Sequence, residues 1–304
     1  MAHYKLALLG FGNVGQALAE LLLRKQAELA DRYDITFSVT GIATARHGTV
    51  IQPNGIDLAK VLELVQTKRS LNLITKSLIA NSFDFIHKCG ADVLFENTPV
   101  NHQNGQPAVD HVRTALDLGM HVCTANKGTV VHAYREVKER AQAKGRKFYF
   151  ESTVMDGAPI FSLFREAIPA AQLRSFQGVL NSTTNIILTR MEAGETFSQA
   201  VKHCQEIGIA ETDPSADVDG WDAAIKVAAL VTVLMDMPFP PQQVERTGIR
   251  GITPAMVAAA KAEGKRYKLV CFAEREGESV RARVAPELVP MASPMYAVEG
   301  STSI

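Results

Sequence analysis

The stretch Lys5-Leu6-Ala7-Leu8-Leu9 runs directly into Gly10-Phe11-Gly12-Asn13-Val14-Gly15, and this segment decides the fold of the first half of the chain. Its first five residues form a short apolar run that is typical of a buried parallel strand. Apolar residues then recur at helical spacing, at Val14, Leu18, Leu21 and Leu22. Strand, G-x-G-x-x-G and helix in this order predict a dinucleotide-binding turn.

The three glycines have separate tasks in such a turn. Gly10 permits the tight bend, Gly12 lets a pyrophosphate approach the backbone, and Gly15 lets helix and strand pack closely. The phosphates then meet the positive end of the helix. A lone G-x-G-x-x-G is often only a glycine turn, but its place between a first strand and a first helix favours nucleotide binding. We therefore assign the cofactor to Gly10, Phe11, Gly12, Asn13, Val14 and Gly15.

The sequence after this turn alternates as a doubly wound domain should. Further strands are predicted at Ile35–Ala43, Asp92–Glu96, Met120–Thr124 and Lys147–Glu151. Helices are predicted at Pro107–Leu118 and Val131–Lys144. Residues 1–150 are thus expected to form a Rossmann-type parallel sheet.

Two polar turns follow strands of this sheet, around Thr98-Pro99 and Lys127. Ligands of doubly wound sheets bind beyond the carboxyl ends of the strands, so these turns are candidates to contact the cofactor. Lys127 could also reach the substrate, and the alternative is a solvated loop lysine. The end of the second strand lacks the carboxylate typical of NAD selectivity and has Arg46 nearby. A guanidinium there favours NADP, although Arg46 could equally be a surface residue.

Length and composition limit the class of protein. A chain of 304 residues exceeds the usual size of one core, so a second domain at residues 151–304 is expected. Lys+Arg and Asp+Glu number 32 each and are interspersed, which gives no basic stripe for nucleic acid. No apolar stretch is long enough for a membrane helix, and no export signal is present. The four cysteines form no C-x-x-C pair, as expected of a cytoplasmic protein with reduced thiols.

The second half contains five carboxylates between Glu211 and Asp222, followed by a helix predicted at Trp221–Met235. This helix is apolar nearly all round and should be buried. Its single lysine, Lys226, shares a face with Asp222. An ammonium in poor solvent gives up its proton more readily, which suits acid–base catalysis. The alternative is an ordinary exposed ion pair.

Pro214 should keep the carboxylate segment in a loop, with Asp219 as the N-cap of the following helix. Glu211 and Asp217 have no structural task, and carboxylates beside a lysine suit a substrate with an ammonium group. The polar run Asn181–Asn185 is typical of a cap or turn, but it could line a pocket, and we assign Thr183 to the substrate. Other elements predicted here are helices at 157–168 and 196–207 and strands at 173–180, 267–274 and 279–284, which form a mixed α/β domain.

Together these motifs resemble homoserine dehydrogenases. The resemblance covers most of the chain, from the glycine turn through Ala125-Asn126-Lys127-Gly128 and Asn181–Asn185, and above all Gly208–Lys226. It implies NAD(P)-dependent interconversion of L-homoserine and L-aspartate 4-semialdehyde in threonine, methionine and isoleucine biosynthesis. It also implies a Rossmann domain, a mixed α/β (α+β) substrate and dimerisation domain, and a homodimer.

The resemblance further implies residue roles. Lys226 matches the catalytic lysine, Lys127 a second active-site lysine, and Asp222 a carboxylate at the reacting end. Glu211 and Asp217 match residues that hold the substrate ammonium. A monovalent cation, Na⁺ or K⁺, is implied at Glu151, Val154, Asp156 and Ala158, largely through backbone carbonyls, although residues 155–157 depart from the glycine-rich pattern usual there.

The chain stops soon after Pro294 to Gly300, where the family normally continues with a glycine-rich segment and a helix that returns to the nucleotide domain. That return and any regulatory domain are expected to be absent, so threonine inhibition through such a domain is not expected. Two other hypotheses remain: an inactive nucleotide-binding or metabolite-sensing relative, and a dehydrogenase for another amino-acid semialdehyde.

Overall fold

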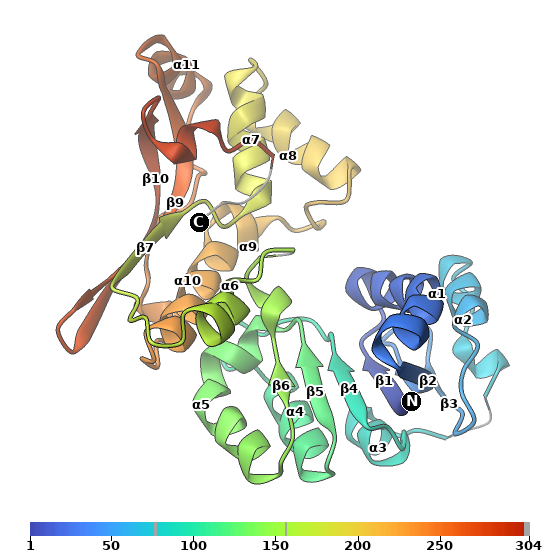
Figure 1. The fold of residues 1–304 in the computed structure, drawn as a ribbon. Helices are drawn as coiled ribbons and strands as arrows, with labels where there is room; N and C mark the ends of the chain where they lie inside the picture. Colours follow the sequence, from blue (N-terminus) through green and yellow to red (C-terminus); the bar gives the residue numbers. More distant parts are fainter. Residues whose placement is uncertain (76–77, 156, 301–304) are drawn as a thin grey trace. The chain divides into compact units, whose positions relative to one another are not determined.

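The computed structural model describes residues 1–75, 78–155 and 157–300. The chain divides into two compact units, Met1–Thr153 and Val154–Ile304, and each has its own sheet (Figure 1). A Rossmann-type sheet followed by a second, mixed α/β unit is the predicted fold class, which is confirmed. Among the described residues, no helix combines the length and apolarity needed to cross a membrane.

The N-terminal unit is built on a six-stranded sheet in the order β3-β2-β1-β4-β5-β6. Its strands are β1 (Ala2–Leu9), β2 (Ile35–Ala43), β3 (Thr49–Ile51), β4 (Val93–Glu96), β5 (His121–Thr124) and β6 (Phe148–Tyr149). All neighbours pair in parallel except β2 and β3, which are antiparallel. Its helices are α1 (Asn13–Tyr33), α2 (Leu58–Gln66), α3 (Ser82–Lys88), α4 (Ala108–Asp117) and α5 (Lys127–Ala143), with 3-10 turns η1 (Leu71–Leu73) and η2 (Glu151–Thr153).

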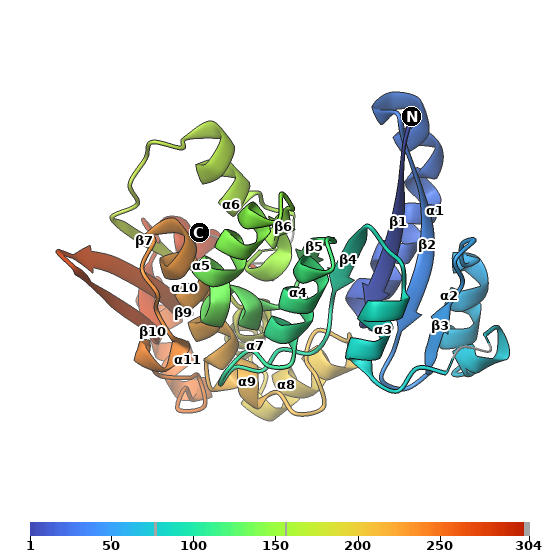
Figure 2. The ribbon, with the colours of Figure 1, turned by 90° about the horizontal axis from the view of Figure 1, so that it is seen from below.

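The central strand β1 supplies side chains to two cores, one on each face of this sheet. Leu6 and Leu8 join a cluster with residues of α1 and α2, whereas Ala7 and Leu9 join a cluster with residues of α3, α4 and α5. Figure 2 shows these two groups of helices on opposite sides of the strands. Each fully buried leucine stabilises the fold by about 1.5–3 kcal/mol. An apolar strand without alternation is therefore the pattern that a doubly wound sheet requires.

The second unit is built on a four-stranded sheet in the order β7-β9-β10-β8. Its strands are β7 (Ser175–Gly178), β8 (Glu245–Arg246), β9 (Lys265–Glu276) and β10 (Ser279–Pro290). Its helices are α6 (Ile160–Ser162), α7 (Ser182–Glu192), α8 (Phe197–Glu206), α9 (Ser215–Val218), α10 (Trp221–Leu234) and α11 (Pro254–Ala262), with the π-helical turn η3 (Leu163–Ala167) and the 3-10 turns η4 (Pro241–Gln243) and η5 (Pro294–Ala297). Helices α7, α10 and α11 pack against β9.

Several predicted elements need correction. The helix predicted at 157–168 is only the short α6, which continues into the π-helical turn η3. The antiparallel pair β9 and β10 is longer than predicted, and α2 and α3 were not predicted. Helix α5 begins at Lys127, earlier than predicted, because Asn126 caps it through a bond from the Gly128 amide.

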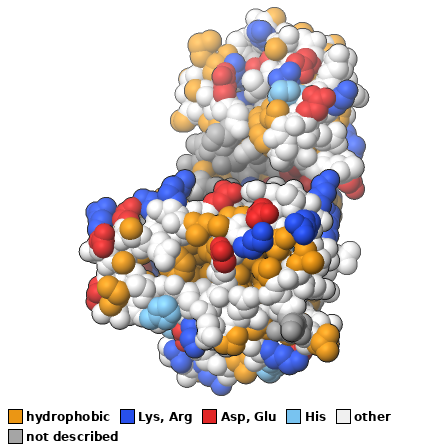
Figure 3. Space-filling model, turned by 90° about the vertical axis from the view of Figure 1, so that its right-hand side faces the viewer, with side chains coloured by type: hydrophobic (Ala, Val, Ile, Leu, Met, Phe, Trp, Pro, Cys, Tyr) orange, Lys and Arg blue, Asp and Glu red, His pale blue; other side chains and the backbone are white. Residues whose placement is uncertain are grey.

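The surface carries both signs of charge. Figure 3 draws one face of the chain, on which acidic and basic side chains are interspersed. Lys+Arg and Asp+Glu balance at 32 each over the whole sequence.

Candidate functional site

The glycine turn of the N-terminal unit has the geometry that nucleotide binding requires. Gly10 has a φ of +93°, and a side chain there would overlap the backbone of Asn97. A Cβ on Gly15 would lie 2.6 Å from the Gly10 carbonyl oxygen. A Cβ on Gly12 would meet nothing within 4 Å, so open space lies beside the N-terminus of α1. Gly12 is the N-cap of that helix and has no side chain to bond its first amides, which leaves backbone donors for a phosphate.

A fully buried carboxylate, Glu96, ties the two polar turns of this unit together. The Thr124 hydroxyl donates to Glu96 Oε2 at 3.0 Å, and the Thr98 amide donates to Glu96 Oε1 at 3.2 Å. The Asn126 side-chain amide donates to the carbonyls of Thr98 and Pro99 at 3.0 and 3.3 Å. The turn with Thr98 and Pro99 is therefore fixed to the start of α5.

The predicted cofactor residues lie in turns that follow strands of the N-terminal sheet. Lys127 is half-buried and is the first residue of α5, beyond the carboxyl end of β5. Gly10 is bonded to the end of β2 through its amide and the Ala43 carbonyl at 3.0 Å. Arg46 lies in the turn after β2 and is exposed. The glycine turn, Thr98, Pro99 and Lys127 thus lie at the same edge of the sheet.

A pocket of about 280 Å³ lies at this edge. Its lining comes from α1, β4, β5 and the segment after β6: Val14, Leu18, Phe95, Asn97, Cys123, Thr124, Ala125, Tyr149, Phe150, Glu151 and Ser152. Burial raises the pKa of the Cys123 thiol to about 11, so this thiol is neutral at physiological pH. The lining is mostly apolar and includes the polar side chains of Asn97, Thr124 and Ser152, which fits a flat heteroaromatic ring.

In the second unit, α10 is buried as its apolar sequence predicts. Lys226 Nζ lies 3.2 Å from Asp222 Oδ2, and the two side chains are only 14% and 19% exposed. The alternative of an ordinary exposed ion pair is therefore wrong. Lys226 also donates to the Leu180 carbonyl at 2.8 Å. The ammonium is thus held between a carboxylate of its own helix and the backbone before α7.

Asp217 belongs to the same cluster. Its Oδ1 accepts from the Asn181 side-chain amide at 2.6 Å, and the same nitrogen donates to Asp222 Oδ2 at 3.0 Å. Burial raises the pKa of Asp217, and the neighbouring Asp222 carboxylate adds to this effect, whereas Asn181, Thr183 and Lys226 oppose it. Thr183 is itself buried on α7. The structure therefore brings Lys226, Asp222, Asp217 and Thr183 together.

Other predictions for this segment were wrong or only partly met. Asp217 lies in the short helix α9 rather than in a loop, because Pro214 precedes a helical turn instead of preventing one. Asp219 is not the N-cap of α10; Gly220 takes that position in the left-handed conformation, and Asp219 pairs with Arg250. Glu211 is exposed, and its loop is held by Gln205, whose amide donates to the Glu211 and Thr212 carbonyls.

Sequence reasoning assigned no task to Glu96, and it did not predict that Asn181 contacts the two acids. A carboxylate that ends a buried strand is a signal that could have identified Glu96. For Asn181, the signal was its place at the head of a polar run, where it was taken as a cap or turn.

The predicted monovalent-cation site stays a prediction. Glu151 opens a 3-10 turn at the end of the N-terminal unit, whereas Val154 and Ala158 belong to the second unit and Asp156 lies outside the described residues. Within residues 1–75, 78–155 and 157–300, no group of three or more His, Cys, Asp and Glu side chains is placed to hold a metal ion.

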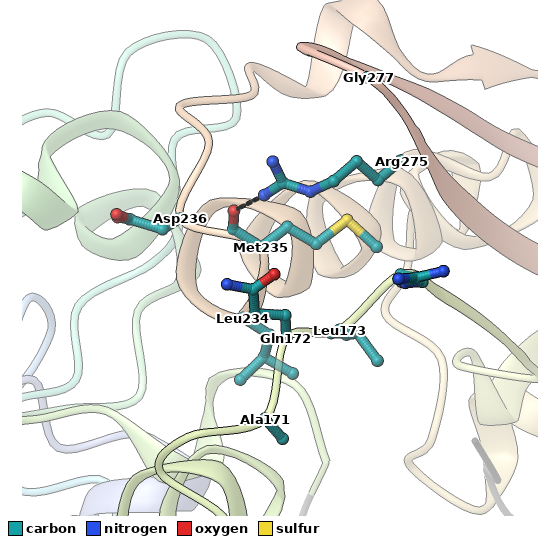
Figure 4. Close-up of a pocket in the computed structure, with 9 residues that line it drawn as sticks. Ala171, Gln172, Leu173, Leu234, Met235, Asp236, Arg275 and Gly277 are labelled. Atoms are coloured by element: carbon teal, nitrogen blue, oxygen red, sulfur yellow. Dashed lines mark hydrogen bonds between the residues drawn. The ribbon is translucent and has the colours of Figure 1, made fainter.

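A pocket of about 550 Å³ in the second unit is separate from the cluster of Lys226, Asp222 and Asp217. Figure 4 shows it beside the C-terminal end of α10, where the Arg275 guanidinium donates to the Met235 carbonyl. Met235 is nine residues beyond Lys226, or about 13 Å along the helix axis. None of the predicted site residues lines this pocket.

Residues 10–151 match the family model described as homoserine dehydrogenase, NAD binding domain, and residues 159–304 match the one described as homoserine dehydrogenase. The chain is 33% identical to the NAD(+)-dependent homoserine dehydrogenase of Pseudomonas canavaninivorans, over 100% of this chain and 87% of that protein.

Two solved structures are similar to the whole chain. A putative homoserine dehydrogenase from Archaeoglobus fulgidus is 31% identical, with a TM-score of 0.83, over 97% of this chain and 87% of that one. A hyperthermophilic archaeal homoserine dehydrogenase in complex with NADPH is 28% identical, with a TM-score of 0.80, over 98% and 85% of the two chains.

The raised pKa of Asp217 gives a stability prediction. A carboxyl group whose pKa is higher in the folded than in the unfolded state stabilises the fold below its unfolded pKa, near 3.8, and this contribution is lost as the pH rises through the folded pKa. At pH 7.5 the ionised Asp217 therefore costs stability. We expect Asp217→Asn to raise the melting temperature at pH 7.5, by an amount that shrinks as the pH falls toward 4. Calorimetry at several pH values measures this; a lower melting temperature at pH 7.5 would contradict it.

Proposed function

This chain belongs to the homoserine dehydrogenase family, and on that premise we propose that it interconverts L-homoserine and L-aspartate 4-semialdehyde, as a step in threonine, methionine and isoleucine biosynthesis. The observation that carries the proposal is the half-buried cluster of Lys226, Asp222 and Asp217, which combines a proton donor with acids for an amino-acid substrate. The proposed class is NAD(P)-dependent oxidoreductase.

The N-terminal unit fits a nicotinamide nucleotide. We assign the pyrophosphate to the open space beside Gly12 and the unbonded amides at the start of α1. Thr98 and Pro99 would form the wall beside the pocket at the carboxyl edge. When bound, such a nucleotide supplies or accepts the hydride. The protein would position the nicotinamide ring and exclude water from its surroundings.

The second unit supplies the acid–base chemistry. In reduction, the carbonyl carbon of the semialdehyde gains a hydride and its oxygen gains a proton from Lys226, directly or through a water, which yields the alcohol. In oxidation, Lys226 takes this proton back. Asp222 keeps the ammonium oriented at 3.2 Å. Lys127 is proposed as a second lysine that contacts the substrate.

Substrate binding is assigned to the acids. Asp217 and Glu211 pair with the substrate ammonium, and Thr183 adds a hydroxyl near Asp217. Pairing a charged ligand with acids on this unit fixes the position of the reacting carbon, which proximity catalysis requires. The same pairing compensates the cost of keeping the half-buried Asp217 ionised.

The direct test is oxidation of NADPH and of NADH in the presence of L-aspartate 4-semialdehyde. Turnover supports the proposal. Nucleotide binding without turnover would indicate a sensor, and turnover only with another carbonyl compound would indicate a dehydrogenase of another substrate class.

The catalytic assignment of Lys226 is tested by Lys226→Met, which keeps the apolar stem and removes the ammonium. We expect kcat to fall by roughly 10²–10⁴-fold with nucleotide affinity unchanged, because only proton transfer is lost. Lys202→Met is the matched control, since Lys202 also forms an i,i+4 pair, with Glu206, but is 76% exposed. A Lys226→Met enzyme with near-normal kcat would refute the assignment.

For the cofactor we propose a preference for NADP over NAD, carried by Arg46. One similar protein is named as NAD(+)-dependent and one solved relative contains NADPH, so the family includes both nucleotides. We expect Arg46→Ala to raise KM for NADPH about 10–100-fold and to leave KM for NADH unchanged, because only the 2′-phosphate loses a charged partner. Arg24→Ala, on exposed α1 surface, serves as control. Equal effects on both nucleotides would refute the role.

We also propose that the chain forms a homodimer through the second unit. The contact face is the side of the four-stranded sheet β7-β9-β10-β8 that points away from the helices. One row on that face crosses all four strands: Gln177, Phe272, Arg283 and Glu245. The neighbouring positions, which point to the opposite face, are buried: Cys271, Ala273, Ala282 and Val284. A half-exposed phenylalanine in a polar row is typical of a contact surface.

Phe272→Glu should therefore yield a monomer, because it places a charge at the centre of that surface. Light scattering coupled to gel filtration gives the mass. Met256→Glu, an exposed apolar position on α11, should keep the wild-type mass. A dimeric Phe272→Glu variant would contradict the assigned face.

A further inference from the structure

Asn181 is a cap residue whose side chain has a fixed orientation. It is the N-cap of α7 and is 3% exposed. Its Oδ1 accepts from the Thr184 backbone amide at 2.8 Å and from the Thr184 hydroxyl at 2.8 Å. Since a backbone amide can only donate, the side-chain atom that faces it is the carbonyl oxygen. The NH₂ group must then point the other way.

The NH₂ group points at two carboxylates. It donates to Asp217 Oδ1 at 2.6 Å and to Asp222 Oδ2 at 3.0 Å. These acids lie on different helices, α9 and α10, and they are separated from Asn181 by 36 and 41 residues. Two carboxylates in a poorly solvated site repel each other, and a donor shared between them offsets the repulsion.

The residue before Asn181, Leu180, binds the positively charged group of the cluster through its backbone carbonyl. The Leu180 carbonyl accepts from Lys226 Nζ at 2.8 Å, while Asp222 Oδ2 lies 3.2 Å from the same ammonium. Two consecutive residues, Leu180 and Asn181, therefore contact both the lysine and the two acids. A small shift of this dipeptide would move the three charged groups together.

We propose that Asn181 is a positioning residue: its one side-chain amide holds Asp217 for the substrate ammonium and Asp222 for Lys226, and so assigns the two acids their separate partners. This inference rests on the proposed function for its substrate. It goes beyond it by naming a residue that acts through Asp217 and Asp222 and thereby sets the affinity for the amino acid.

The alternative task of Asn181 is helix capping alone, and one variant separates the two. Serine is as good an N-cap as asparagine, so Asn181→Ser keeps the bond to the Thr184 amide and removes both donors to the acids. Asn181→Asp keeps the cap and the shape but puts a third carboxylate against the other two. Asn81→Ser, at the N-cap of α3 in the N-terminal unit, is the control for capping.

We expect Asn181→Ser to raise KM for homoserine about 10–100-fold, the loss typical of a hydrogen bond to a charged group, with nucleotide affinity and melting temperature close to wild type. Asn181→Asp should lose at least as much kcat/KM, although it is isosteric. Asn81→Ser should change neither parameter.

The pH dependence of kcat/KM gives a second readout, which would not change if Asn181 were only a helix cap. The ionisable groups that face Asp217 are Asp222 and Lys226 from α10 and the Cys204 thiol from α8. The bond from Asn181 lowers the pKa of Asp217. Without that bond, the acidic limb of kcat/KM should move to higher pH in Asn181→Ser. An unchanged KM and an unchanged acidic limb in a folded Asn181→Ser enzyme would overturn the inference, as would wild-type kcat/KM in Asn181→Asp.

A failure of the proposed function is recognised separately, because the wild-type protein would then not turn over homoserine. In that case the carboxyl carbon of Asp217, followed by ¹³C NMR as the pH is varied, decides on Asn181. The inference predicts a higher Asp217 pKa in Asn181→Ser than in the wild-type protein. Equal pKa values in the two proteins would overturn it.

Discussion

The second unit depends on the balance of charge at the start of α10, where one ammonium and two carboxylates lie in a nearly dry setting. Lys226 and Asp222 are each less than one-fifth exposed, and Asp217 is joined to Asp222 through Asn181. Charges in such a setting destabilise a fold unless each one is paired and hydrogen-bonded. The Leu180 carbonyl and the Asn181 side chain supply further bonds, so the segment before α7 meets helices α9 and α10 at this point.

This arrangement serves ligand binding at a cost to the stability of the fold. The raised pKa of Asp217 means that its ionised form is destabilised at neutral pH. A ligand ammonium beside the carboxylate would offset this cost. The N-terminal unit uses a similar device, because the buried carboxylate of Glu96 gathers donors from Thr98 and Thr124 and thereby fixes two turns at the sheet edge. In the N-terminal unit this buried acid thus organises the turns that would contact a ligand.

The sequence predicted those parts of the structure that depend on local pattern. The bounds of β2 were predicted as observed, and the burial of α10 followed from the near absence of polar side chains in it. The assignment of particular residues to substrate and cofactor came from the family resemblance rather than from spacing.

What the sequence could not predict rests on contacts between distant residues. Asp219 was expected to cap α10, but it pairs with Arg250, 31 residues later, and a glycine begins the helix. Asn181 was expected to act as a cap or turn, but it also reaches two acids far along the chain. No periodicity encodes such pairs, because they depend on how helices pack and not on their own sequence.

The central claim is that the acids of the second unit recognise the substrate through its ammonium group. The most direct measurement compares kcat/KM for L-homoserine with kcat/KM for 4-hydroxybutanoate, which has the same reacting alcohol and lacks the amino group. Pairing with Asp217 predicts a loss of roughly 10²–10³-fold for the analogue, since the half-buried carboxylate is left without its partner. Equal values for the two alcohols would contradict the claim.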